Sequence, residues 1–190
     1  MDDSLRRESV PHPMKLGKSA SDNFESLFRE YWAPINRLLA RMVADPAEAE
    51  DLALETFFRL HKHQSALDDG SNIRGWLHRV AANLALHSIR SFKRRAQYEL
   101  SAGKDALEEA SHNQPPEIFD EREDRRMIRL ALGQMNQRHA EILIMRYSGM
   151  AYKEIAAALN LSPTSIGPLL LRAEHEFEKS YRALTREEET

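Results

Sequence analysis

The sequence predicts an all-α protein made of two small helical domains joined by a flexible linker. Three observations predict this fold class. Apolar residues recur three and four positions apart over several long segments, which is the spacing of an amphipathic helix. No segment of useful length alternates between apolar and polar residues, as a half-buried strand would. An acidic, weakly patterned stretch separates the two helical blocks.

The composition excludes several classes of protein. Of the 190 residues, 42% are hydrophobic and 30% are charged, as expected of a chain that folds and stays in solution. Cysteine is absent, which excludes disulfides and thiolate metal sites and suits a reducing cytoplasm. No apolar run approaches the roughly 20 residues that span a bilayer. Because the formal net charge is −3, any nucleic-acid surface must be a local patch.

The first helical domain is expected over residues 21–95. It follows a polar arm at residues 1–20, which is expected to be flexible and shows no apolar stretch typical of an export signal. The first helix begins at Ser21 or Asp22, either of which can serve as its N-cap. Pro34 falls inside the apolar pattern and is expected to kink or break this helix.

Two further helices complete the first domain. Asp45 is the predicted N-cap of a helix that starts at Pro46 and runs to about His63. A loop rich in Asp, Gly, Ser and Asn follows, and a third helix spans residues 74–95. That helix ends in more positive charge than a favourable interaction with the helix dipole requires. The residues of this basic cluster are Arg90, Lys93, Arg94 and Arg95.

Residues 96–125 are acidic and contain a Pro-Pro pair, so they are expected to form a linker, with a short helical piece at residues 104–110. This is longer than a typical connection inside one compact domain. The second helical domain is expected over residues 126–184 and a tail over residues 185–190.

The second domain contains the pattern of a helix-turn-helix. Asn160 stands at the turn, where a left-handed backbone is needed. Ser162 is the predicted N-cap of the second helix, and Pro163 its first residue. The apolar and small residues expected to hold the two helices together are Ile155, Ala156, Leu159, Ile166 and Leu170.

Three motifs resemble the sigma-70 family of RNA polymerase subunits. "RYSGMAYKEIA" is similar to the R-x-x-G-x-x-x-x-E-I-A of region 4, which leads into its helix-turn-helix. "AEDLALETF" resembles the A-E-D-L-x-x-E-x-F core of region 2, and "WLHRVAAN" resembles its W-L-x-x-I-A-x-N helix. The motifs stand in the family's order. Because no further domain separates them, the resemblance points to the extracytoplasmic-function group.

The resemblance implies a protein that binds core RNA polymerase, through the β′ clamp and the β flap, and directs it to promoter DNA. Such a subunit initiates transcription and is not an enzyme. The implied polymerase-docking residues are Glu50, Asp51, Glu55 and Phe58. The residues implied for the −10 element are Arg74, Trp76, Arg79, Asn83, Arg90, Lys93, Arg94 and Arg95, beside the loop at residues 68–72. Those implied for the −35 element are Ser162, Thr164, Ser165, Gly167 and Arg172.

Some of these residues have simpler interpretations. Acidic residues early in a helix interact favourably with the helix dipole whatever their use. The spacing of Trp76 fits a core position as well as a DNA contact. The recognition helix departs most from the family, because Arg172 is its one remaining cation and Pro168 is expected to kink it. Leu169 and Leu171 stand where polar or basic residues are usual, which predicts a weak or largely apolar −35 contact.

Two other functions fit parts of the pattern. Region 4 could be a protein-binding surface on which exposed leucines hold an anti-sigma factor or another regulator. The chain could also be a helix-turn-helix regulator that acts without polymerase, although such a regulator needs no acidic docking helix. The eight histidines show no metal-ligand spacing, and no phosphate-binding glycine loop or activated nucleophile is present, so no metal, cofactor or catalytic residue is predicted.

Overall fold

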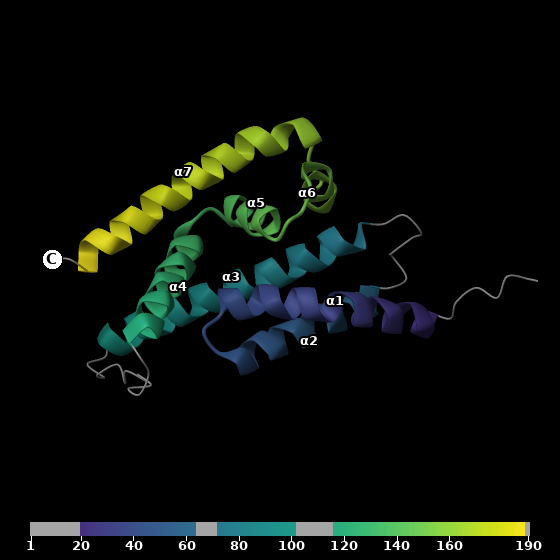
Figure 1. Cartoon of the computed structure of the whole chain (residues 1–190), viewed down its shortest axis with the longest axis horizontal. Coiled ribbons are helices and arrows are strands. Elements are labelled where there is room, and N and C mark those ends of the chain that lie inside the picture. The colour runs from purple at the N-terminus through teal and green to yellow at the C-terminus, as the bar shows by residue number, and fades with distance from the viewer. Residues whose placement is uncertain (1–19, 64–71, 102–115, 189–190) are drawn as a thin grey trace, which may run out of the picture.

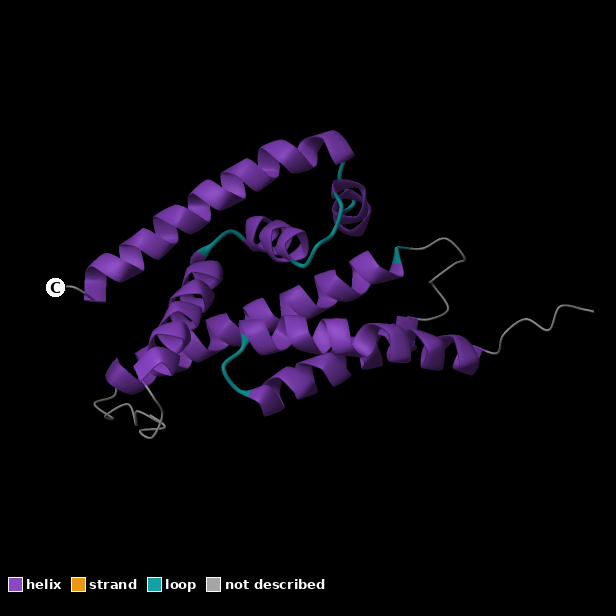
Figure 2. Ribbon diagram, in the orientation of Figure 1, coloured by secondary structure: helices purple, strands orange, loops and turns teal. Residues whose placement is uncertain are grey.

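The computed structural model describes residues 20–63, 72–101 and 116–188, and these residues form seven helices and no strand (Figures 1 and 2). The all-α prediction is therefore confirmed. No helix among them is long and apolar enough to cross a membrane. The helices are α1 (Ala20–Met42), α2 (Pro46–His63), α3 (Ile73–Ser101), α4 (Pro116–Gln134), α5 (Gln137–Tyr147), α6 (Tyr152–Leu159) and α7 (Pro163–Glu188).

The first three helices form a bundle that runs along the long axis of the molecule (Figure 1). Asp45 caps α2 as predicted, because its Oδ1 accepts the Ala47 N–H at 3.0 Å. Aromatic side chains fill the space between α1 and α2, with the Phe28 ring centroid 4.8 Å from that of Phe57. The largest fully buried side chains of the bundle are Ile35, Leu39, Phe57, Leu60, Leu77 and Leu86.

Proline does not interrupt two helices in which a disturbance was expected. A kink or a break was expected at Pro34, and α1 is continuous through it, so the break is excluded. The buried side chains of Ile35 and Leu39 follow the proline, and their packing outweighs the loss of one backbone hydrogen bond. α7 likewise continues through Pro168 between the buried Ile166 and Leu170.

Helix extends into both ends of the segment predicted to be a linker. α3 continues past Arg95 and ends at Ser101. It continues because the residues after Arg95 include good helix formers such as Ala, Gln, Glu and Leu. Pro116 is the first residue of α4, where a proline fits, so the Pro-Pro pair marks a helix start. The helical piece expected at residues 104–110 lies outside the described residues.

The remaining helices pack above α3, with α7 as the long outer helix (Figure 1). The turn between α6 and α7 has the predicted form, since Asn160 adopts φ 54° and ψ 50°. Small Ala156 is 1% exposed, which lets α6 and α7 cross closely. Gly149, with φ 81°, makes the turn between α5 and α6.

Gly167 and Gly149 should respond to alanine in opposite directions. A Cβ at Gly167 would lie 3.8 Å from the Tyr152 ring, an ordinary contact, so Gly167→Ala should stabilise the helix by about 0.5–1 kcal/mol. Gly149→Ala should destabilise the protein because its φ of 81° strains any residue with a Cβ. Urea unfolding measures the change in the free energy of unfolding of each variant. Equal changes in the two variants would contradict the difference expected between these two backbone conformations.

Candidate functional site

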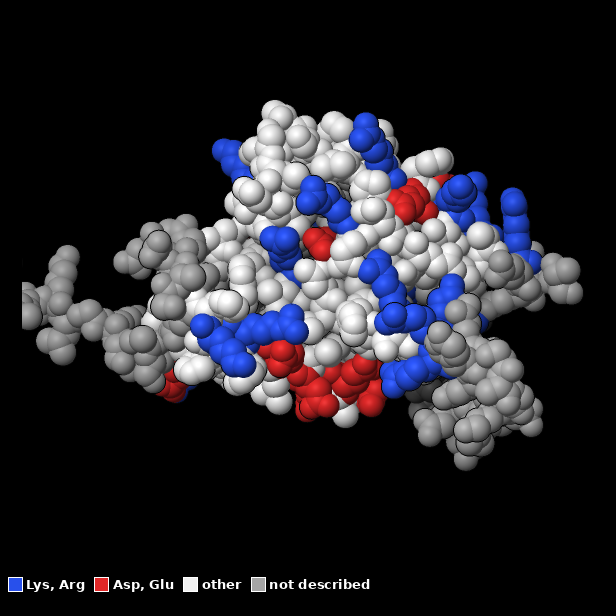
Figure 3. All heavy atoms as spheres, turned by 180° about the vertical axis from the view of Figure 1, so that it is seen from behind, with Lys and Arg blue, Asp and Glu red and all other residues white. Residues whose placement is uncertain are grey.

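The exposed face of α2 combines carboxylates with apolar side chains. Leu54 and Phe58, one helical turn apart, are 53% and 50% exposed. The predicted docking carboxylates Glu50 and Asp51 are also exposed, and Glu55 pairs with Arg59 of the same helix. Acidic side chains form a patch along the lower edge of the molecule, over α2 (Figure 3).

We call Glu50, Asp51, Leu54, Glu55 and Phe58 the α2 face. Phe58 lies beside Lys62, whose Nζ is 4.1 Å from the ring centroid. A contiguous exposed apolar surface that is rimmed by polar side chains is typical of a site for a protein partner. Leu54 was not among the docking residues that the resemblance implied, although it lies one turn before Phe58.

The N-terminal half of α3 contacts α6. The Arg74 guanidinium donates to Oε1 of Glu154 at 3.0 Å, and Arg79 donates to the Ala158 carbonyl oxygen at 3.0 Å. The Asn72 side-chain amide donates to the Glu154 carbonyl oxygen at 2.6 Å. Two residues predicted to contact DNA, Arg74 and Arg79, are therefore engaged by the helix-turn-helix unit.

Glu154 joins the cap of α6 to the contact with α3. Its Oε2 accepts the Ala151 N–H at 2.7 Å, while Oε1 accepts from Arg74. The Ala151 hydrogen bond and the Arg74 charge lower the pKa of Glu154, although partial burial opposes them. The carboxylate is therefore charged at neutral pH. In the sequence, Glu154 stood out only as part of a motif.

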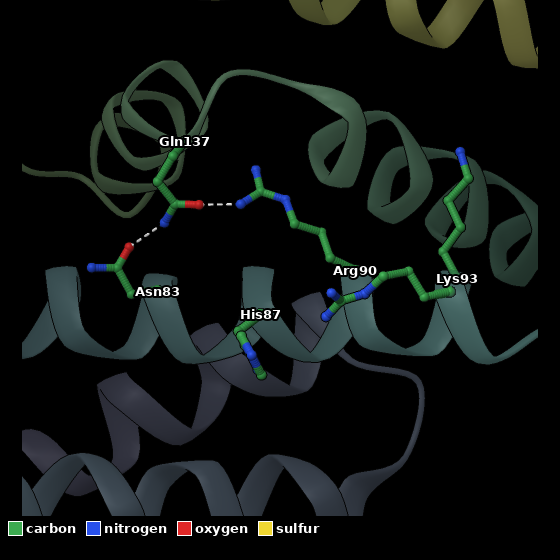
Figure 4. A pocket seen from close by; sticks show the side chains of 6 residues that line it. Asn83, His87, Arg90, Lys93 and Gln137 are labelled. Atoms are coloured by element: carbon green, nitrogen blue, oxygen red, sulfur yellow. Dashed lines mark hydrogen bonds between the residues drawn. The ribbon is translucent and has the colours of Figure 1, made fainter.

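The C-terminal half of α3 contacts the junction of α4 and α5. Arg90 donates from Nε to the Gly133 carbonyl oxygen and from a terminal nitrogen to that of Met135, both at 3.0 Å. Its other terminal nitrogen donates to the Gln137 side chain, which in turn donates to Asn83 (Figure 4). The predicted DNA contacts Asn83 and Arg90 are thus also engaged by the second helical unit.

A groove of about 500 Å³ lies between this part of α3 and α5 (Figure 4). Arg90, Gln137 and Asn83 close one side, and His87 and Lys93 extend from α3 (Figure 4). Its lining residues are Asn83, His87, Arg90, Lys93, Arg94 and Gln137. Such a concentration of basic side chains suits phosphate. His87 was not among the residues that the resemblance implied for DNA binding.

The other predicted −10 residues differ in exposure. Arg94 and Arg95 are exposed, whereas Lys93 is half-buried. Trp76 is also half-buried and packs against the core, with its ring centroid 6.3 Å from that of His63. Part of the Trp76 side chain is therefore buried against the core, and the rest is accessible to solvent. The loop expected at residues 68–72 lies outside the described residues except for Asn72.

The start of α7 presents hydroxyl groups rather than cations. Ser162 and Thr164 are exposed, and their hydroxyl oxygens lie 2.8 Å apart, while Ser165 and Gly167 are half-buried. Arg172 is exposed.

The two leucines expected to be exposed on α7 differ. Leu171 is 69% exposed, but Leu169 is half-buried and packs against the core. The expectation of two exposed leucines is therefore wrong for Leu169. The reason is that Leu169 precedes the buried Leu170 on a helix seated against α6, so one edge of its side chain meets the core. Leu171 alone leaves a large apolar side chain open to a partner.

His78 should make the fold sensitive to mild acid. The side chain is 4% exposed, its Nδ1 lies 2.8 Å from the Arg74 carbonyl oxygen, and burial lowers its pKa from 6.5. The folded state therefore binds the proton less readily than the unfolded state. Stability is complete well above pH 6.5 and declines as pH falls through the window between the unfolded and folded pKa values.

The melting temperature should accordingly fall when pH is lowered from about 7.5 to about 5.5, and fall less in His78→Gln, which does not titrate. Circular dichroism melts measure both proteins. Equal falls in the two would mean that another group titrates. Glu154 is not that group, since its pKa lies below 4.5 and it loses its charge at lower pH.

Among residues 20–63, 72–101 and 116–188, no group of three or more potential metal ligands lies close enough together to hold an ion.

Two family models match the chain, one to each helical unit. The model described as Sigma-70 region 2 matches residues 27–95, and the model described as Sigma-70, region 4 matches residues 125–174. The first match contains the α2 face and most of α3. The second contains the helix-turn-helix. We use region 2 and region 4 for these two units below.

Curated proteins match over most of their length. The chain is 31% identical to "RNA polymerase sigma factor CarQ" of Myxococcus xanthus over 161 residues, covering 84% of this chain and 88% of that one. It is 28% identical to "RNA polymerase sigma factor YlaC" of Bacillus subtilis over 171 residues, covering 88% and 96%.

Two solved structures share the fold. One is the sigma factor RpoE in complex with the anti-sigma factor NepR from Bartonella quintana, with TM-score 0.51, 19% identity, and coverage of 84% of this chain and 97% of that one. The other is CnrH in complex with the cytosolic domain of CnrY, with TM-score 0.55, 18% identity, and coverage of 86% and 92%.

Proposed function

The chain belongs to the extracytoplasmic-function group of the sigma-70 family, and we propose that it binds core RNA polymerase and directs it to promoters to initiate transcription. The observation that carries this proposal is the presence, in one chain, of an apolar and acidic α2 face together with a basic α3 and a helix-turn-helix. A repressor that acts alone needs no such docking face. The sigma-factor function accounts for all three.

The α2 face, α3 and region 4 each make a different contact with the polymerase or the promoter. The α2 face docks on the β′ clamp through Leu54 and Phe58, with its carboxylates meeting basic residues of the clamp. α3 takes the melted −10 strand, because its basic side chains contact phosphates and Asn83 offers an amide to a base. Region 4 also docks on the β flap.

The start of α7 reads the −35 element with unusual chemistry. Ser162 and Thr164 offer hydroxyl groups to base edges or phosphates, and Arg172 supplies a cation. Leu171 contributes an apolar contact, to a thymine methyl in the major groove. This set of residues predicts a −35 contact that depends less on salt than one made by several arginines.

The partners follow from the same function. They are core RNA polymerase and promoter DNA, and the site of action is the cytoplasm. The two solved structures of similar fold are complexes with protein partners, and in the RpoE complex that partner is an anti-sigma factor, which supports an anti-sigma factor as a further partner. The polymerase performs the chemistry, and this chain contributes binding and positioning.

Holoenzyme formation tests the proposal. The purified full chain is mixed with bacterial core RNA polymerase, and the mixture is separated by size-exclusion chromatography. We expect the chain to elute with the polymerase, and a tenfold excess of a well-characterised sigma factor to displace it, because the two share the β′ clamp. A chain that elutes alone at every concentration tested would overturn the proposal.

A further inference from the structure

We propose that the groove between α3 and α5 binds a small polyphosphate anion, and that this anion competes with promoter DNA for the basic end of α3. The competition rests on the proposed function, which assigns the basic end of α3 to DNA phosphates. The groove has a volume of about 500 Å³, which lies within the range of sites for small molecules. Among the described residues that line it, none is acidic.

The cations of the groove keep their full charge. Arg90 donates to two backbone carbonyl oxygens and to the Gln137 side chain, all of which are neutral, so it is held in place without being neutralised. Among the described side chains, no carboxylate forms an ion pair with Lys93 or Arg94. Glu141 accepts from Gln137 at 2.9 Å, but it is 6% exposed and does not line the groove. Several uncompensated cations attract a ligand with more than one negative charge.

The polar groups that the groove offers to a ligand are mainly hydrogen-bond donors. The Gln137 side-chain oxygen already accepts from Arg90, and the Asn83 side-chain oxygen accepts from the Gln137 amide (Figure 4). Lysine and arginine side chains have donors only, and the His87 ring can donate or accept. Phosphate oxygens are acceptors, so a chain of phosphates matches this groove better than a ligand rich in hydroxyl or amine donors.

The two walls of the groove suit a compact chain of phosphates. His87, Arg90 and Arg94 lie three and four residues apart and therefore share one face of α3. At 1.5 Å per residue this row is about 10 Å long, comparable to a chain of two or three phosphates. The opposite wall is the first turn of α5, which begins at Gln137, and the N-terminal end of a helix carries partial positive charge. Both walls therefore attract the same anion.

The site draws on both regions of the chain. α3 belongs to region 2 and α5 to region 4, so the anion contacts residues that are far apart in the sequence. It also occupies Lys93 and Arg94, which are proposed to contact phosphates of the −10 strand. Polyphosphate should therefore lower the affinity of the chain for −10 DNA.

Titration calorimetry on the purified full chain, at constant ionic strength and without divalent cations, measures the binding. We expect one site for inorganic tripolyphosphate and an affinity about tenfold lower or less for orthophosphate, which reaches fewer cations at once. A nucleoside triphosphate identifies the source of the phosphates. Tighter binding than tripolyphosphate indicates a nucleotide, and equal or weaker binding indicates a free polyphosphate chain. Absence of tripolyphosphate binding, or an equal affinity for sulfate, would overturn the proposal.

Two variants with the same loss of charge locate the site. Lys93→Gln combined with Arg94→Gln should weaken tripolyphosphate binding by about tenfold or more, because hydrogen bonds to charged groups are lost. Arg37→Gln combined with Arg41→Gln is the control, since both arginines are exposed, lie one turn apart on α1 and do not line the groove. Equal losses in the two variants would mean general attraction to a basic protein and would contradict a site in the groove.

Gln137→Glu tests the wall that α5 supplies. Gln137 is not among the proposed DNA contacts, and a carboxylate at its position should repel the anion and weaken tripolyphosphate binding by about tenfold. Gln134→Glu is the control, because Gln134 is exposed near the same turn and does not line the groove. Circular dichroism melts without ligand check that both variants fold. If Gln137→Glu does not fold, the variant that lacks Lys93 and Arg94 decides the question.

Competition with DNA separates this proposal from the proposed function. A fluorescent single-stranded −10 oligonucleotide, selected by the holoenzyme, is bound to the full chain and titrated with tripolyphosphate at constant ionic strength. We expect displacement from the unmodified chain and from Gln134→Glu, and displacement from Gln137→Glu only at about tenfold higher tripolyphosphate. Simultaneous binding of both ligands would refute the competition. A chain that binds tripolyphosphate but not the oligonucleotide would sink the −10 assignment, and the competition with it, and leave the anion site standing.

Discussion

Phe58→Ala is expected to lower the affinity of the chain for core RNA polymerase by about tenfold to a hundredfold. A large aromatic side chain at the centre of an interface is worth about 2 kcal/mol or more when truncated. Phe58 is half exposed and lies beside Leu54 on the α2 face. Fluorescence titration of labelled chain with core polymerase measures the change.

The same substitution should leave the fold intact. Since half of Phe58 is already in solvent, the free energy of unfolding should change by about 0.5–1 kcal/mol at most, including the contact with Lys62. Phe92→Ala is the matched control, because Phe92 is an exposed phenylalanine on α3, away from the α2 face. Equal losses of polymerase affinity in the two variants would contradict the assignment of the α2 face.

Replacing Lys93, Arg94 and Arg95 together by alanine should weaken promoter binding by the holoenzyme and make it less sensitive to salt. Each phosphate contact releases about 0.9 counterion from duplex DNA and about 0.7 from a single strand. Loss of three contacts should therefore reduce the slope of log affinity against log salt by about two to three. Filter binding at a series of salt concentrations measures the slope.

Loss of net charge anywhere on the chain could also lower the salt dependence. A second triple variant therefore separates a general charge effect from the loss of specific phosphate contacts. Arg29, Lys179 and Arg182 are exposed and lie on α1 and α7, and alanine at these three positions changes the net charge by the same amount. If the slope falls equally in both variants, the basic end of α3 has no particular contact with promoter DNA.

Local signals in the sequence were enough to predict several elements. α2 has the predicted bounds because Asp45 and Pro46 supply a cap and a first residue that leave little choice of start. The turn of the helix-turn-helix was predictable from Asn160, since a left-handed backbone narrows the choice of residue there. The amphipathic spacing gave the helices and most of the buried core.

Interactions between distant segments could not be predicted in this way. A kink or a break was expected at Pro34, but packing of α1 on its neighbours, which no local pattern records, keeps the helix continuous there. The pair of Arg74 and Glu154 joins residues 80 positions apart, and each residue alone fits a solvent-exposed helix face. The assignment of the −10 residues to DNA contact therefore stays a prediction from the sequence. It could not reveal that region 4 contacts four of them.

Transcription in a purified system tests the central claim most directly. Core polymerase and fragmented genomic DNA of the organism that encodes the chain are incubated with and without it, and the 5′ ends of the transcripts are sequenced. If the chain is a promoter-recognition subunit, it should produce a discrete set of new start sites that share −10 and −35 sequences, and Phe58→Ala should abolish or strongly weaken them. Start sites that are identical with and without the chain would contradict the claim.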